Sequence, residues 1–479
     1  MPNPTAEKNC AAWPRRSQHP FGFKEGSSLL RCLRCPFCSG TLRSTKADQL
    51  RDAPEYDILV CYCGHYPVVA GIPVLKKGNI GSDGKTSAEV IALIEGGRHR
   101  EALLSMIMPP SPASTELLPV WIQYLPSIKG IRRLKHRSHL KALSRWQEKT
   151  ASALTDPEKN ALACDLLDCY FRRSGLKKND RYDYFAYRFG QPRHLMALSF
   201  ASVIRQPRKP ILDLGCGMGH LTRTLVQRGE GQSIIGMDGN FFYLYIAKHW
   251  IAPQATYVCC WGEPSLPFPD EAFSTAFCSD AFNYFTHKAT SIRELKRITR
   301  NDGLIMLIYL RNPLFKYPYC GEPLLLEGYQ ALVADMPHRL VSNNVILTRY
   351  LQRQGPPLVK SAEAGDLAQD PTLSVIISHR GEIFRDYGRF EEWPHAEGRL
   401  ELNPLYVEEK RDGSGNVYFR RSFPAAWYEE DNAECKQYLP EVVCINSKTL
   451  LDLANGKRTQ EMEKLIERCV LLGMPERYR

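Results

Sequence analysis

A glycine-rich turn that joins an apolar strand to a helix constrains this chain more than any other feature. The apolar run Ile211–Leu214 leads into three glycines at alternate positions, Gly215, Gly217 and Gly219, and a helical pattern opens at Leu221. Glycine lets the backbone turn tightly and approach a ligand closely, where the first N–H groups of a helix lack internal partners. The pattern predicts an α/β fold with a ligand at this turn.

A carboxylate follows at the distance expected for a ligand that carries a ribose. A second apolar run, Ser233–Met237, ends at Asp238, 19 residues after Gly219, where a carboxylate can accept hydrogen bonds from ribose hydroxyls. A glycine-rich turn alone also fits dinucleotide enzymes. The alternative without a ligand is a capping aspartate beside turn glycines. Strand, glycines, helix, strand and acid all occur here in order, which favours the ligand site.

The segment Ile211–Gly219, ILDLGCGMG, resembles the first motif of the class I S-adenosylmethionine (SAM)-dependent methyltransferases of the methyltransferase-11-like kind. The similarity continues through Leu266–Ser274, Arg293–Ile298 and Asn301–Leu304. Dinucleotide enzymes usually have a different glycine spacing and no aspartate two residues before the first glycine. The resemblance implies a Rossmann-like methyltransferase core over residues 206–316.

The same resemblance implies a set of residues that bind SAM. They are Asp213, Gly215, Cys216, Gly217, Gly219, Asp238 and Trp261. The glycine loop would face the methionine and ribose end, and Asp238 the ribose. The family often has an acidic residue shortly before Leu-Pro-Phe that contacts adenine. This chain has Cys260–Glu263 there, so we expect Trp261 to stack on adenine instead.

Polar residues after the fourth predicted strand are the candidates for the methyl-acceptor site. The run Thr275–Cys278 is followed by Asp280, Asn283 and Tyr284, and ligands bind at the carboxyl ends of strands in open α/β sheets. We therefore predict catalytic roles for these three residues. The alternative is that Asp280 caps a helix and Tyr284 belongs to the core. The two nearby histidines are expected at the surface rather than as bases: His220 and His287.

A cluster of cysteines lies near the N-terminal end of the chain. Of 16 cysteines, five lie between residues 32 and 63, and no secretory signal precedes them, which favours a metal over disulfides. We predict a structural Zn²⁺ site made of Cys35, Cys38, Cys61 and Cys63. His65 is an alternative to Cys63 as fourth ligand, and Cys32 is a spare thiol. A degenerate ribbon without metal is the alternative to the whole site.

The surrounding segment, residues 29–75, resembles the Trm112-like zinc ribbons. The matching features are Leu33–Cys38 and the strand-like run Tyr66–Leu75. Modules of that family often precede or partner methyltransferases, so the resemblance implies a structural or substrate-presenting role here. Four protein ligands leave no open position on the metal for chemistry.

The remaining segments complete the predicted organisation. We expect a disordered tail over 1–26, a zinc ribbon over 27–78, a helical connector over 87–205, the core over 206–316, and a C-terminal α+β extension over 317–479 that shapes the acceptor site. Within these segments we predict helices over 88–107, 151–171, 324–334, 344–354 and 447–472, and a hairpin of strands 405–411 and 416–423.

Composition bounds the partners. The formal charge is +11 and the basic stretch Arg132–Lys141 is compatible with a helix, so RNA is a possible partner, although a solvated helix explains the stretch as well. No run of 18 apolar residues occurs, so we expect no membrane partner and a cytoplasmic protein. The oligomeric state is left open.

These features together predict a SAM-dependent methyltransferase that acts on a small-molecule acceptor, such as a secondary metabolite or a sugar-like compound. One alternative is an rRNA or tRNA base methyltransferase, because a zinc ribbon also precedes some of those enzymes. The other is a non-catalytic scaffold with a SAM-binding fold that binds a protein partner. The intact glycine loop and Asp238 favour an enzyme.

Overall fold

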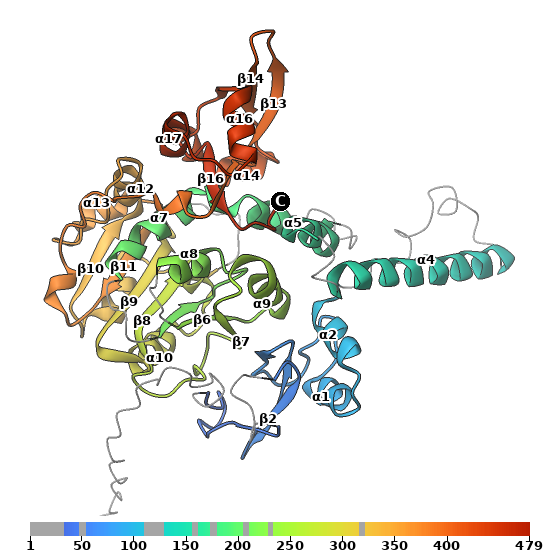
Figure 1. Ribbon diagram of the computed structural model, residues 1–479. Coiled ribbons are helices and arrows are strands. Elements are labelled where there is room, and N and C mark those ends of the chain that lie inside the picture. Colours follow the sequence, from blue (N-terminus) through green and yellow to red (C-terminus); the bar gives the residue numbers. More distant parts are fainter. Residues whose placement is uncertain are drawn as a thin grey trace, which may run out of the picture.

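The computed structural model (Figure 1) describes residues 33–46, 54–109, 129–155, 161–172, 180–204, 210–228, 233–315 and 321–479. The tail expected over residues 1–26 and the spare thiol Cys32 lie outside these ranges. Most side chains of the basic stretch Arg132–Lys141 also lie outside what the structure describes.

A seven-stranded sheet lies at the centre of the molecule. Its strands, in chain order, are β5 (Ile211–Leu214), β6 (Ile234–Asp238), β7 (Thr256–Cys259), β8 (Phe273–Ser279), β9 (Thr299–Arg311), β10 (His338–Ser342) and β11 (Thr372–Ile377). The order across the sheet is β10-β11-β9-β8-β5-β6-β7. Strands β9, β8, β5, β6 and β7 are parallel, which confirms the predicted βαβ pattern. The order reverses between β5 and β8, and ligands bind at such a switch point.

Helices cover both faces of this sheet. Ile211 on β5 packs into one core with α7 (Pro192–Phe200), α8 (His220–Arg228) and α9 (Phe241–Ile246), while its neighbour Leu212 packs into a second core with α10 (Lys288–Ile298) and α11 (Leu326–Val333). Successive strand residues point to opposite faces, so a strand buried on both sides is apolar throughout. The predicted Rossmann-like architecture is confirmed.

The predicted core boundary at residue 316 is wrong. Strands β10 and β11 lie in the region predicted to be an extension, yet they complete the sheet: β11 pairs antiparallel with β9, and β10 with β11. Helices α12 (Asn343–Leu351) and α13 (Ala364–Ala368) lie between β10 and β11 in the chain. The sequence similarity stops near β9 because the closing strands are joined by long segments without a recognisable motif.

The N-terminal module is a small antiparallel sheet of β1 (Arg43–Ser44), β2 (Asp57–Cys61), β3 (Gly64–Val69) and β4 (Ile72–Pro73). The run Tyr66–Leu75, predicted as one strand, is a hairpin, because the chain turns at Ala70 and Gly71 and β4 pairs back on β3. A continuous apolar run therefore concealed a turn.

This module is attached to the β7 edge of the central sheet. Val74 forms a parallel bridge with Cys259, and the Leu75 amide donates to the Cys259 carbonyl at 2.8 Å. Residues of the module, Leu59 and Tyr66 among them, are buried in the same core as α10. The module thus extends the large sheet and shares its core.

The secondary-structure elements described in the predicted connector are all helices. Its elements are α1 (Ser87–Glu95), α2 (His99–Ile107), α4 (Lys129–Thr155), α5 (Ala163–Leu167), η2 (Asp168–Arg172), α6 (Asp180–Ala186), η3 (Arg188–Gly190), α7 and η4 (Ala201–Val203). The helix expected over 88–107 is two helices, separated at Gly96 and Gly97. Helix α4 projects away from the rest of the molecule (Figure 1).

The C-terminal part confirms the predicted hairpin, with β13 (Tyr406–Arg411) and β14 (Asn416–Arg421), joined by β15 (Val442–Asn446). The single helix expected over 447–472 is wrong: α16 (Ser447–Ala454) ends at Asn455, and α17 (Gln460–Glu467) precedes β16 (Leu471–Met474). The break occurs at Asn455–Gly456, where a left-handed glycine follows the helix. Strand β16 pairs with β12 (Arg399–Leu402).

This C-terminal region packs on the connector beside the core. The Tyr438 hydroxyl, at the end of α15 (Cys435–Tyr438), donates to the Gly190 carbonyl at 2.7 Å, and the Ala163 amide donates to the Arg477 carbonyl at 2.8 Å. Helix α14 (Ala426–Asp431) contacts α6. In the part of the chain that the structure describes, no helix combines the length and apolar character needed to cross a membrane.

Candidate active site

The glycine loop lies at the switch point between β5 and β8. Gly215 has a φ of +71°, and a Cβ added there would stand 2.4 Å from the Cβ of Ala281, the residue that follows the end of β8 by two positions. Only glycine fits this left-handed, crowded position. The Gly215 amide donates to the Met237 carbonyl at 2.8 Å, so the loop is fixed between two neighbouring strand ends.

Asp238 lies beside this loop, as predicted. Its carboxylate accepts hydrogen bonds from the Gly217 amide at 3.0 Å and the Asn240 amide at 2.8 Å. Burial raises the pKa of Asp238, and these amides oppose the rise. These hydrogen bonds hold the Asp238 carboxylate next to the glycine loop, where it can accept hydrogen bonds from ribose hydroxyls.

Asp213 is buried at the end of β5 and lines the cavity of the glycine loop. Its carboxylate accepts a hydrogen bond from the Thr222 hydroxyl on α8 at 2.6 Å. Burial raises the pKa of Asp213 to about 7, while the Thr222 hydrogen bond works in the opposite direction. The side chain therefore ties the loop to the helix that follows it.

Trp261 lies close to Asp238, and its side chain is 58% exposed. Its ring lies directly against Gly239: a Cβ at that glycine would be 2.5 Å from the Trp261 Cε3. The indole thus offers a partly exposed aromatic surface close to Asp238.

A cavity opens beside the glycine loop, and the connector contributes much of its wall. It is lined by Tyr184, Phe185, Arg188, His194, Ala197, Asp213, Gly215, Cys216, Gly217, Met218, His220, Leu221, Ser279 and Asp280. The sequence interpretation missed Tyr184 and Arg188. The available signal was the dense run of tyrosine and arginine over residues 181–188, directly before the core.

Asp280 is buried and takes a left-handed φ of +56°. Its Oδ2 accepts from the Tyr184 hydroxyl at 3.0 Å and from guanidinium groups of Arg188 and Arg193, both at 3.4 Å. Burial raises the pKa of Asp280, but Arg193 and Arg188 outweigh it and the net pKa is lowered. An ionised carboxylate held by two arginines is a weak proton acceptor, so Asp280 is better suited to orienting a ligand than to acting as a general base.

Two polar atoms at the end of β8 lack hydrogen-bond partners among the described residues, although both are buried: Asp280 Oδ1 and Ser279 Oγ. Both residues line the cavity. A buried polar atom without a partner is costly, so such atoms mark a place where a ligand supplies the partner.

The C-terminal region reaches the same cluster. Arg193 is almost fully buried, and its second guanidinium nitrogen donates to the Asp431 carboxylate at the end of α14 and to the Asp431 carbonyl at 3.2 Å. Arg193 thereby joins the core, through Asp280, to the C-terminal region.

Asn283 and Tyr284 lie differently from one another. Asn283 is fully buried, donates to the Tyr309 carbonyl at 2.9 Å and accepts from the Arg311 amide at 2.8 Å, so its amide holds two backbone groups. Tyr284 is 51% exposed, and its hydroxyl accepts from Arg311 at 3.3 Å. Of the two, Tyr284 is therefore the one available to an acceptor.

The expectation of two surface histidines is half correct. His287 is exposed at the start of α10. His220 is buried, lines the cavity, and lies 3.1 Å from the Tyr478 hydroxyl. Burial lowers the pKa of His220 well below its ordinary value, so the ring is neutral. The sequence suggested an exposed His220 because the C-terminal segment that covers it is distant along the chain.

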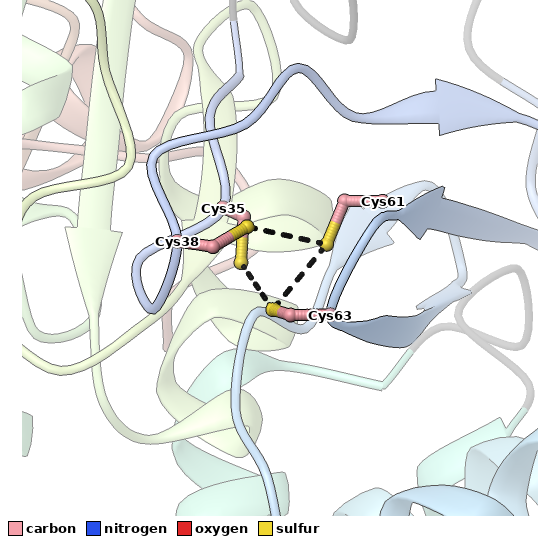
Figure 2. A group of neighbouring side chains, drawn as sticks. All are labelled: Cys35, Cys38, Cys61 and Cys63. Atoms are coloured by element: carbon pink, nitrogen blue, oxygen red, sulfur yellow. Dashed lines mark hydrogen bonds between the residues drawn. The ribbon is translucent and has the colours of Figure 1, made fainter.

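The four predicted cysteine ligands meet at one point (Figure 2), and all four Sγ atoms lie within 4.8 Å of one another. The Sγ–Sγ distances are 3.4 Å for Cys35–Cys63, 3.6 Å for Cys61–Cys63 and 3.9 Å for Cys38–Cys61. Tetrahedral zinc with Zn–S bonds of about 2.3 Å implies Sγ–Sγ distances of about 3.8 Å. The set therefore fits a four-thiolate metal site, and the exposed His65 is not part of it.

One of these thiols is poised to ionise. Burial raises the pKa of Cys35, but hydrogen bonds from the Tyr66 hydroxyl and the backbone amides of Phe37 and Cys38 outweigh it and lower the pKa to about 6. The Tyr66 hydroxyl lies 3.1 Å from the Cys35 sulfur. Metal ligands must be thiolates, and this hydrogen-bond environment stabilises a thiolate at Cys35, whereas the pKa values of Cys38 and Cys61 are raised.

Comparison with known proteins supports the interpretation of this region as a ligand-binding site. Residues 212–307 match the family profile described as a methyltransferase domain. A malonyl-[acyl-carrier protein] O-methyltransferase of Halorhodospira halophila is 28% identical over 268 residues, which cover 53% of this chain and 86% of that relative. The chain contains a SAM-dependent methyltransferase domain.

Two further comparisons concern this methyltransferase. A ubiquinone/menaquinone biosynthesis C-methyltransferase of Proteus mirabilis is 26% identical over 159 residues, 32% of this chain and 60% of that relative, so the match spans less than two thirds of its length. The YcgJ protein of Bacillus subtilis is similar in structure, with 18% identity and a TM-score of 0.28, over 39% of this chain and 99% of that one.

Proposed function

We propose that this methyltransferase acts on a small organic acceptor that reaches the cavity beside the glycine loop. The observation that carries the proposal is how closely that cavity is walled. Arg188, His194, Asp213, His220 and Asp280 line it, and all are more than nine-tenths buried. A site walled by buried side chains admits a small or slender group.

The relatives support the same class of acceptor. One is named a malonyl-[acyl-carrier protein] O-methyltransferase and the other a ubiquinone/menaquinone biosynthesis C-methyltransferase. An RNA substrate would have to extrude a nucleotide to reach a walled cavity. The basic stretch that suggested RNA lies on α4, which points away from the core (Figure 1). The scaffold alternative is disfavoured because the glycine loop and Asp238 keep the geometry of a ligand site.

We propose the following roles for the cofactor residues. Asp238 accepts the ribose hydroxyls, and Trp261 stacks on adenine. Arg188 binds the methionine carboxylate, while Asp280 Oδ1 and Ser279 Oγ receive the ammonium group, which would satisfy two buried polar atoms. SAM, when bound, supplies a methyl group on an electrophilic sulfonium.

The chain's own contribution to the reaction is then position. Holding donor and acceptor in line supplies much of the rate when the acceptor is already nucleophilic. Asp280 acts as a positioning residue that orders Tyr184 and Arg188 through its Oδ2. Tyr284, which is exposed beside this cluster, is the predicted contact to the acceptor. The four cysteines would hold a structural zinc ion.

The test begins with the cofactor. Calorimetric titration of SAM should give micromolar affinity for the wild type and at least tenfold weaker binding for Asp238→Ala, about 1.4 kcal/mol. Asp335→Ala, which removes an exposed carboxylate paired with Lys296, is the matched control and should bind normally.

The acceptor is tested next by measuring release of S-adenosylhomocysteine (SAH) with panels of hydroxylated and carboxylated small molecules and with total RNA. Turnover with a small molecule, and none with RNA, is the expected result. Turnover with RNA alone would reject the small-molecule proposal, and absence of SAM binding by the wild type would reject the role of this site.

A further inference from the structure

Two adjacent lysines at the end of the N-terminal module touch two different sites. Lys76 reaches the cofactor side of the core, and Lys77 reaches the cysteine cluster. We propose that the Lys76–Lys77 segment couples metal occupancy of the four-cysteine site to binding of SAM or SAH. The inference rests on the proposed cofactor site and goes beyond it, because it assigns the module a regulatory effect on that site.

Lys76 is 9% exposed, and its ammonium donates to the Gly239 carbonyl at 3.0 Å. The same ammonium lies 4.1 Å from the centre of the Trp261 ring, a cation–π contact. Gly239 is the residue that follows Asp238. Lys76 therefore fixes the indole and the strand end that are proposed to hold adenine and ribose, which makes it a positioning residue of the cofactor site.

Lys77 contacts the cysteine cluster in two ways. Its ammonium donates to the Cys63 carbonyl at 3.2 Å and lies 3.7 Å from the Cys63 sulfur. It also lies 4.5 Å from the centre of the Phe37 ring, and the Phe37 amide donates to the Cys35 sulfur at 3.4 Å. Zn²⁺ with four thiolates carries a net negative charge, so an ammonium at this position is attracted to the occupied site.

The residues just before the two lysines cannot move freely. The Val74 bridge to Cys259 and the Leu75 amide hydrogen bond to the same residue hold the backbone as an added strand of the central sheet. The Cys260 sulfur also contacts the Leu75 carbonyl at 3.6 Å. Because the backbone is held at Val74 and Leu75, a shift of Lys77 away from the cysteine cluster also changes the position of its direct neighbour Lys76.

Coupling of this kind is reciprocal. If the metal favours the arrangement of Lys76 that orders Trp261, it raises SAH affinity, and bound SAH must favour retention of the metal by the same factor. We expect a factor of at least about five, within the usual range for coupled sites. The second effect can be measured without any acceptor or turnover.

The experiment uses the zinc-loaded full chain and a chromogenic zinc chelator. Saturating SAH should protect bound zinc from the chelator, seen as an at least fivefold higher zinc affinity of the wild type at equilibrium. Lys77→Met should retain SAH binding but lose this protection, and Lys76→Met should lose it while binding SAH more weakly. Lys85→Met removes a nearby lysine that pairs with Asp83 and should behave as wild type.

The outcomes separate the two proposals. If the wild type binds SAH but has the same zinc affinity with and without it, the coupling is rejected and the cofactor site stands. Protection that survives in both lysine variants rejects the assigned route. A wild type that binds no SAH rejects the proposed cofactor site itself, and the coupling with it. The wild-type comparison requires no variant to fold.

Discussion

Several side chains of the candidate site are buried away from water. Asp213 is 2% exposed, and burial raises its pKa to about 7 despite the hydrogen bond from Thr222. An unfolded chain would release that proton near the ordinary value of about 3.9. A carboxyl group of this kind makes the stability of the core depend on pH.

The direction follows from proton linkage. Between the unfolded and folded pKa values, the folded chain holds a proton that the unfolded chain has lost, so rising pH destabilises the fold. Asp213→Asn does not titrate. The free energy of unfolding of Asp213→Asn relative to wild type should therefore rise by about 2–3 kcal/mol from pH 5 to pH 8. Denaturant titrations of ligand-free protein at both pH values measure it.

The control for this prediction is Asp270→Asn, which alters a carboxylate at the protein surface. Its effect on the free energy of unfolding should change little over the same pH range. A difference between Asp213→Asn and wild type that stays constant from pH 5 to pH 8 would show that Asp213 is ionised in the folded protein.

Residue identity alone predicted part of the candidate site. The glycine loop, Asp238 and Trp261 come together as expected because they follow consecutive strands of one sheet. Tyr184 and Arg188 were missed because they reach the cavity from a different module. Contacts between segments distant in the sequence leave no periodic trace in it, and the same holds for Lys76.

At the scale of elements, the glycine loop between β5 and α8 is the most constrained turn. In Gly215→Ala, a Cβ would meet Ala281 at 2.4 Å in a left-handed conformation. Backbone strain of about 1–2 kcal/mol adds to an overpacking cost of about 1–3 kcal/mol. We expect a loss of stability of about 2–5 kcal/mol and loss of SAH binding, measured by denaturation and calorimetry.

Gly84→Ala separates the two costs in that prediction. Gly84 also has a positive φ, of +87°, but no atom lies within 4 Å of an added Cβ. This variant should lose only the strain contribution and keep SAH affinity. Equal losses in the two variants would show that crowding at Ala281 is unimportant.

Elements were predicted well where periodicity is long and poorly where a turn interrupts an apolar pattern. The parallel strands and the hairpin β13–β14 were found because glycine and aspartate punctuate them. The helix expected over 447–472 failed because the stop signal Asn455–Gly456 and the polar residues after it were overlooked. The run Tyr66–Leu75 failed because the residues on both sides of its turn are apolar. Tertiary packing, not local propensity, decides where such segments fold back.

At the scale of the whole molecule, Arg193 connects the core to the C-terminal region through Asp280 and Asp431. Removing one partner of a buried ion pair leaves an uncompensated charge and costs about 3–5 kcal/mol. Arg193→Met should lower the free energy of unfolding by about this amount and loosen the C-terminal region. Urea denaturation, followed together with limited proteolysis, measures both effects.

A double-mutant cycle with Asp431→Asn tests whether the connection runs through that pair. Because Arg193 donates to the Asp431 side chain, the two substitutions should be non-additive by at least about 0.5 kcal/mol. Additive effects would mean that Arg193 stabilises the core alone, and that the C-terminal region is held by its other contacts.

The attachment of Val74 and Leu75 along β7 has one more consequence. An outer strand of a sheet presents backbone donors and acceptors that any other extended chain can pair with, and proteins protect such edges from aggregation. Here the N-terminal module, which carries the four clustered cysteines, covers the β7 edge. We therefore expect loss of the proposed zinc ion, or oxidation of those thiols, to expose the β7 edge to pairing with other extended chains.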